Sequence, residues 1–214
     1  MKKTVATLSL LIIAIATQAQ VTVKPGVRAG LNLSTFTNSD FDRKADFYVG
    51  GMVSVKLADF YTLQPELNYS RQGAKGSYTD YDFSFDPVAG DLVQRDYDYS
   101  IQYLSLGLMN KFTFVEGFHA IVGPTLDFRV GDNFPELLDG NPVDFDFALN
   151  GGIGYTLPMG LTIEARYKLG MIDIFGDYLD EDWDEDDDNW GDDNGNYDDV
   201  RLNSVFQLGV SYSF

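Results

Sequence analysis

The sequence predicts an all-β fold, an eight-stranded antiparallel transmembrane β-barrel with short periplasmic turns and long extracellular loops. Three observations predict it. Eight segments alternate apolar and polar residues with the period of two that is typical of half-exposed strands. Their connections alternate between very short and long, which is the loop pattern of outer-membrane barrels. After the N-terminus, no apolar run approaches the roughly 20 residues that a membrane-spanning helix needs.

The composition excludes several other classes of protein. The 214 residues include 33 acidic residues against 15 Lys and Arg, which gives a net charge of −18. This excess of acid argues against a nucleic-acid partner, because phosphate binding needs clustered basic residues. The chain has no Cys, which excludes disulfides, and a single His, which excludes a multi-His metal site within one chain.

Residues 1–19 are predicted to be a cleaved secretory signal peptide. Lys2 and Lys3 form a basic start, an apolar stretch follows, and Thr17 and Ala19 are small residues before a cleavage site. The apolar stretch is too short for a membrane span, which needs about 20 residues. We therefore expect export from a bacterial cytoplasm, and one outer-membrane β-barrel domain over residues 20–214 in contact with outer-membrane lipid.

The eight expected strands can be placed along the chain. They lie near residues 25–36, 47–57, 61–70, 101–114, 118–128, 145–155, 161–169 and 205–214. The connections expected to be long polar loops are residues 37–46, 71–100, 130–144 and 170–201. Pro65 and Pro124 fall within strands, and we expect them to mark β-bulges because Pro cannot donate to the ladder.

Charge indicates which face of each strand turns inward. The minority face carries charged residues, and burying unpaired ions in a soluble core would be very costly. The apolar face is therefore expected in lipid and the polar face in the lumen. The predicted lumen charge cluster consists of Arg28, Glu66, Asp127, Arg129, Glu164, Arg166 and Lys168. Aromatic residues at the ends of the apolar face predict two interfacial girdles, the extracellular one with Phe36, Phe47, Phe128 and Phe145.

Eight strands enclose an interior that side chains just fill. Opposite charges that face each other across so narrow a lumen are expected to form an ion-pair plug that stiffens the barrel. The alternative is a gated or narrow conduction path through the same residues.

The loop at about residues 170–201 is strongly acidic, because no Lys or Arg occurs between Lys168 and Arg201. Such a segment is either a solvated acidic surface or a weak divalent-cation site, since oxygen-rich loops suit Ca²⁺. The candidate ligands are Asp184, Glu185, Asp186, Asp187, Asp188, Asp192 and Asp193. We expect no cofactor apart from weakly bound Ca²⁺ in this loop.

The final strand carries a predicted assembly signal. Its residues Gln207, Gly209, Tyr212 and Phe214 have the spacing of the signal read by the bacterial barrel-assembly machinery, which is therefore the expected partner during insertion. The sequence also resembles the PorT-like outer-membrane β-barrel proteins of Bacteroidota, often labelled porin-family proteins. The segments that carry this resemblance are residues 26–34, 103–112, 123–124, 165–170 and 203–209. The resemblance implies a shared barrel scaffold and leaves the activity open, because members vary in their loops.

No enzymatic activity is expected. His119 is the single His, it lies near the periplasmic end, and no Ser or acid is obviously paired with it. The first functional hypothesis is a non-enzymatic scaffold that displays acidic loops, for an unidentified ligand, in surface interaction or envelope integrity. The second is a narrow porin-like channel that prefers cations because of its acidic mouth. The third, suggested by the resemblance alone, is an accessory role in protein secretion like that of PorT.

Overall fold

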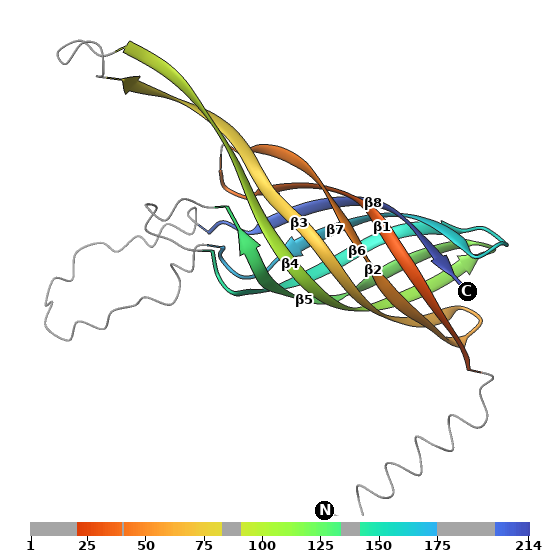
Figure 1. The fold of residues 1–214 in the computed structure, drawn as a ribbon. Helices are drawn as coiled ribbons and strands as arrows, with labels where there is room; N and C mark the ends of the chain where they lie inside the picture. Colours follow the sequence, from red (N-terminus) through yellow and green to blue (C-terminus); the bar gives the residue numbers. More distant parts are fainter. Residues whose placement is uncertain (1–20, 40, 83–90, 134–141, 175–199) are drawn as a thin grey trace, which may run out of the picture.

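The computed structural model describes residues 21–39, 41–82, 91–133, 142–174 and 200–214. At residues 78–82, 91 and 92 it describes the backbone alone. Eight antiparallel strands follow one another around a closed barrel (Figure 1), which confirms the predicted fold class. Among these residues, no helix has the length and apolar character needed to cross a membrane. The predicted signal peptide and most of the acidic loop lie outside the described residues.

The ring is closed by hydrogen bonding between the first and last strands. β1 pairs with β8 from Gly26 opposite Ser213 to Phe36 opposite Asn203. The strands are β1 (Thr22–Phe36), β2 (Asp42–Ala58), β3 (Tyr61–Asp82), β4 (Asp91–Val115), β5 (Phe118–Asp132), β6 (Phe145–Thr156), β7 (Leu161–Gly170) and β8 (Asn203–Ser213).

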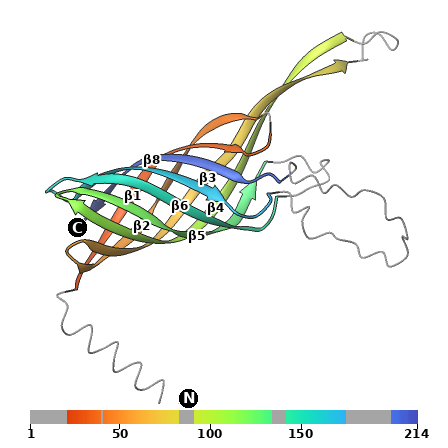
Figure 2. The same ribbon diagram turned by 180° about the vertical axis from the view of Figure 1, so that it is seen from behind.

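The two ends of the barrel differ in their connections. The short connections β2–β3, β4–β5 and β6–β7 meet at one end, which we call the turn end. The start of β1 and the C-terminal residue lie there too, and the Phe214 amide donates to the Pro25 carbonyl at 2.9 Å. We call the opposite end the loop end, and Figure 2 shows the β3–β4 hairpin projecting from it.

The β3–β4 hairpin corrects the prediction of a long loop at residues 71–100. β3 continues to Asp82, β4 already starts at Asp91, and their pairing is regular from Tyr61 opposite Phe112 onward. The outer part of the hairpin is rich in Asp, Ser, Thr and Tyr and poor in aliphatic residues, so it lacks the apolar alternation that indicated the other strands. A ribbon that projects beyond the barrel has no lipid to face and needs no such alternation.

The prediction of bulges at Pro65 and Pro124 was wrong. Pro65 pairs with Leu108 and Pro124 with Leu149, and the register on either side of each Pro is unchanged. The missing N–H leaves a gap in the ladder toward one neighbour without an extra residue. The register shifts lie instead between Arg43 and Tyr48, Lys56 and Ala58, Gln102 and Tyr103, and Thr113 and Val115.

The strands turn apolar side chains outward and mostly polar ones inward. Exposed apolar residues recur at every second position, and examples are Val27, Leu31, Leu67, Leu106, Leu126, Leu149, Ile163 and Leu208. The aromatic residues at the two ends of this outer face include Phe47, Phe128 and Phe145 at the loop end and Phe112, Phe118, Tyr155 and Tyr212 at the turn end. Phe36 was wrongly assigned to this face, because its side chain is only 2% exposed and points into the barrel.

Candidate functional site

Arg166 is the centre of a buried ion-pair network that crosses the barrel. β7 and β3 are four strands apart in a ring of eight, so Arg166 on β7 and Glu66 on β3 come from opposite walls. Arg166 Nη1 and Nη2 donate to the two Glu66 oxygens at 2.9 and 2.8 Å. Its Nε and Nη2 also donate to Glu164 Oε2 at 3.1 and 2.6 Å. A paired fork of this kind is among the stronger charged contacts, and all three side chains are at least 96% buried.

Arg28 completes the network from β1. Its Nη1 donates to Glu66, and its Nη2 donates to the Tyr48 hydroxyl at 3.2 Å. The guanidinium also lies over the Tyr48 ring, 4.7 Å from its centroid. Glu66 therefore faces two guanidinium groups, which compensates the cost of burying its charge.

Two glycines make room for the Tyr48 ring. Gly30 on β1 and Gly209 on β8 are paired directly at the seam that closes the barrel. A Cβ atom at Gly209 would overlap the Tyr48 hydroxyl, and one at Gly30 would overlap the β8 backbone at Leu208 and Gly209 first and the Tyr48 ring as well. Gly209 thus has a packing role inside the barrel in addition to its place in the predicted assembly signal.

His119 and Gln64 also belong to this network, although neither was among the predicted lumen charges. His119 Nε2 lies 3.2 Å from Glu164 Oε1, an acidic partner that was not obvious from the sequence. Gln64 Nε2 donates to Glu66 Oε1 at 2.8 Å. Both residues occupy inward positions of the strand alternation, between neighbours that face outward. This pattern was a usable signal that they belong to the lumen. We call the following residues the lumen network: Arg28, Tyr48, Gln64, Glu66, His119, Glu164 and Arg166.

The remaining predicted lumen charges divide into two places. Lys168 and Asp127 form a separate buried ion pair nearer the loop end. Arg129 does not join either group, because its side chain is 20% exposed and pairs with Asp132 and with Asp144, the latter at 2.7 Å. Its position near the end of β5 places it at the mouth of the barrel, which corrects its assignment to the cluster.

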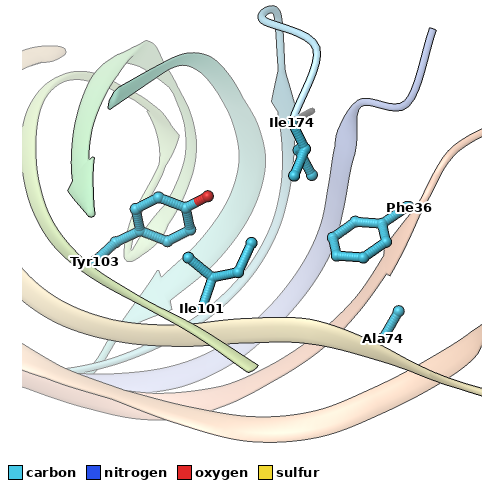
Figure 3. Packing of buried hydrophobic residues seen from close by; sticks show 5 residues of the cluster. All are labelled: Phe36, Ala74, Ile101, Tyr103 and Ile174. Atoms are coloured by element: carbon cyan, nitrogen blue, oxygen red, sulfur yellow. The ribbon is translucent and has the colours of Figure 1, made fainter. Parts of the chain in front are cut away.

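A second closure lies at the loop end and is apolar. Figure 3 shows side chains from β1, β3 and β4 meeting a residue that follows β7. We call these five buried residues the apolar cap: Phe36, Ala74, Ile101, Tyr103 and Ile174. Asp146 helps to hold the segment that carries Ile174, since it accepts from the Met171 and Ile172 amides at 3.3 and 3.2 Å. The Ile174 amide itself donates to the Arg201 carbonyl at 3.0 Å.

The empty space inside the barrel is unequal on the two sides of the lumen network. A cavity of about 20 Å³ lies toward the loop end and is lined in part by Arg28, Arg166 and Lys168, which leaves room for about one water molecule. A cavity of about 570 Å³ lies at the turn end, and we call it the vestibule. Its inward-facing lining includes Lys24, Lys56, Thr62, Lys111, Thr113 and Thr162.

The other predicted sites are placed only in part. The candidate cation ligands between residues 184 and 193 lie outside the described residues. In the described ranges, no three His, Asp or Glu side chains are grouped as a metal site. Of the predicted assembly signal, Gln207 points inward and donates to Asn32 Oδ1 at 2.9 Å, whereas Tyr212 and Phe214 are exposed on the outer face.

A match to a protein-family model agrees with the barrel. A family model described as outer membrane protein beta-barrel domain matches residues 18–176. The solved structure of Neisserial surface protein A is 10% identical, with a TM-score of 0.47 over 90% of this chain and 97% of that one. Ail, the attachment invasion locus protein of Yersinia pestis, crystallised with the heparin analogue sucrose octasulfate, is 11% identical, with a TM-score of 0.44 over 90% and 99%. At these low values no function is transferred from either protein. No curated protein matches the chain.

Proposed function

The chain belongs to the outer-membrane protein β-barrel domain family, and we propose that it is a closed, non-enzymatic scaffold that displays its long loops at the cell surface. Family membership indicates the outer membrane as its location. In such barrels short turns face the periplasm and long loops face outward, so the turn end is periplasmic and the loop end extracellular in this proposal. The display would serve surface interaction or envelope integrity.

The observation that carries this proposal is the wall-to-wall ion pairing of Arg166 with Glu66. It crosses the lumen from wall to wall, and the cavity beside it measures about 20 Å³. The apolar cap obstructs the same path a second time, nearer the extracellular side. Two closures in series favour a scaffold over a conducting pore.

The contacts of His119 support a non-enzymatic role. A His-based hydrolase needs a hydroxyl nucleophile within hydrogen-bond reach of the imidazole. In the described part of the chain, the hydrogen bonds of His119 go to the Glu164 carboxylate and the Gly117 carbonyl. The side chain is also 99% buried, which leaves little access for a lipid substrate.

A narrow channel is the second candidate, favoured by the polar lumen and by the vestibule at the turn end. Its expected cation preference is opposed by the vestibule, because Lys24, Lys56 and Lys111 line it and basic linings favour anions. We therefore infer that any conducting form would not be a simple cation pore.

Single-channel recording of the mature protein in a planar bilayer tests the closed scaffold. We expect no discrete current steps from the wild type, with folding verified by the heat-modifiable gel shift. The variant Arg166→Ala should also give no current steps, because the apolar cap remains. The double variant Arg166→Ala/Ile174→Ala removes parts of both closures, and current steps are expected from it. Regular wild-type steps that change selectivity when residues 180–199 are deleted would support the channel instead.

The display role has its own test in cells. We expect deletion of residues 177–199 to leave the barrel folded and inserted while it changes detergent sensitivity or binding at the cell surface. A matched barrel with the same number of residues replaced by a Gly/Ser linker separates loop chemistry from loop length. Unchanged phenotypes in both strains would count against display.

The proposal also covers how the protein is exported and inserted, whether its acidic loop binds Ca²⁺, and the bacterial group from which it comes. We propose cleavage of a signal peptide after Ala19, insertion guided by the C-terminal signal, and weak Ca²⁺ binding by the acidic loop. The resemblance to PorT-like proteins favours a Bacteroidota origin and leaves an accessory secretion role as a third candidate.

A further inference from the structure

The vestibule has an ordered basic lining. The register places Thr22 on β1 opposite Lys56 on β2, Lys56 opposite Thr62 on β3, and Thr62 opposite Lys111 on β4. These four residues share the inward face, so ammonium and hydroxyl groups alternate around one side of the cavity. Such an alternation supplies several hydrogen-bond donors toward the same space.

The lysines of the vestibule outnumber its carboxylates, because Lys24, Lys56 and Lys111 share the lining with Asp59 as the one acidic side chain among the described residues. Lys24 forms no ion pair with any carboxylate that the structure describes. Lys111 Nζ lies 3.9 Å from Glu164, a carboxylate that already accepts from Arg166, and donates to Thr156 Oγ1 at 3.3 Å. Lys56 alone has a close partner, Asp59 at 2.8 Å. Three lysines against one Asp give the vestibule a local excess of positive charge in a chain of net charge −18.

The size and position of the cavity suit a small ligand. Ligand-binding pockets commonly measure about 300–1,000 Å³, and the vestibule measures about 570 Å³. It is entered at the turn end, beside the β6–β7 turn and the C-terminal residue. We propose that the vestibule binds a small water-soluble anion that carries phosphate or carboxylate groups and enters from the periplasmic side. This site is separate from the loops that the proposed function concerns.

A free anion fits this geometry better than a lipid headgroup. The three lysines occupy inward positions of the strand alternation and line the vestibule, whereas the neighbouring outward positions are apolar, as Val23 and Leu57 show with exposed fractions of 58% and 42%. A headgroup would have to cross this apolar rim to reach Lys111, which lies deepest and is 13% exposed. A soluble anion reaches the same ammonium group along the barrel axis.

Isothermal titration of the protein purified from membranes in a zwitterionic detergent tests the site. Inorganic pyrophosphate and citrate serve as probes, and we expect saturable binding of both. Losing an ammonium group that donates a hydrogen bond to the anion should weaken binding about tenfold or more. Lys24→Gln and Lys111→Gln should each have this effect. Lys75→Gln is the matched control, because Lys75 lies on β3 at the loop end and pairs with Asp98.

Lys24→Gln keeps the test meaningful if Lys111→Gln fails to fold, since the Lys24 side chain is exposed and outside the lumen network. The proposal is overturned if neither probe binds, or if Lys24→Gln and Lys75→Gln weaken binding equally. A parallel titration in nanodiscs compares phosphatidylcholine with phosphatidylglycerol. Equal pyrophosphate binding in both supports a free anion, whereas loss of binding in phosphatidylglycerol would assign the vestibule to a lipid headgroup and overturn the proposal.

Discussion

The lumen network and the apolar cap fill the same barrel by opposite means. The network joins charged side chains from β1, β3 and β7, and its two central carboxylates each accept from more than one donor. The cap packs apolar side chains from three strands against Ile174, which belongs to a connecting segment. The first closure is built entirely from the barrel wall, and the second depends on a loop that folds inward.

This difference indicates where the barrel is stiff and where it can yield. Removing one partner from a buried ion network leaves an uncompensated charge that cannot relax away. Removing a side chain from the cap leaves a cavity that a neighbouring segment can partly close. The network should therefore contribute most to stability, and the cap should be the more adaptable closure.

Arg166→Ala is expected to have the largest effect. Glu66 and Glu164 would lose their shared partner, and breaking a buried pair in this way costs about 3–5 kcal/mol of unfolding free energy. Urea unfolding in detergent micelles, followed by the heat-modifiable gel shift, measures the loss.

Arg129→Ala is the matched control for that prediction. Both arginines were placed in one lumen cluster from the sequence, but Arg129 is partly exposed at the mouth and its pairs resemble surface ion pairs. Its replacement should cost no more than about 1 kcal/mol. Equal losses for the two variants would show that the lumen network has no special role in stability.

Phe36→Ala should have the next largest effect. Replacing a buried Phe costs about 3–5 kcal/mol, and we expect the lower end because the segment carrying Ile174 can move into the cavity. Phe47→Ala is its control, since Phe47 is 44% exposed on the outer face and packs on Tyr69 at a centroid distance of 6.2 Å. Losing that contact should cost about 1 kcal/mol, so a larger loss for Phe47 than for Phe36 would contradict the apolar cap.

The barrel itself was predictable because each strand carries its own signal. Alternation with a period of two reports which face meets lipid, and this holds strand by strand without knowledge of the partners. The same alternation placed Glu66, Glu164 and Arg166 on the inner face. Their mutual contacts follow from strands that lie opposite one another in a ring of eight.

The apolar cap and the partners of His119 were not predictable in the same way. Phe36 is an apolar residue at a strand end, so its residue type suggested the lipid face although its position in the alternation is inward. Ile174 reaches the lumen through a turn fixed by Asp146, and no periodicity encodes such a contact. His119 meets Glu164 only because two strand registers combine across β6.

Gly209→Ala is expected to have the smallest of the three main effects, and it separates two roles of one residue. The added Cβ would overlap the Tyr48 hydroxyl, which accepts from Arg28 in the lumen network. Overpacking of this kind costs about 1–3 kcal/mol. Refolding of the purified chain into micelles needs no assembly machinery, so a lower unfolding free energy in this assay reports packing alone.

A double-mutant cycle with Tyr48→Ala identifies the cause. Once the Tyr48 side chain is removed, the closest overlap of a Cβ at position 209 is gone and the Ala29 carbonyl oxygen at 2.9 Å remains, so adding Gly209→Ala to Tyr48→Ala should cost less than Gly209→Ala costs in the wild type. Additive losses would mean that the Tyr48 ring is not what requires glycine at this seam. If the single variant refolds with full stability in micelles but accumulates poorly in cells, Gly209 acts through the assembly signal, and the contact with Tyr48 is incidental.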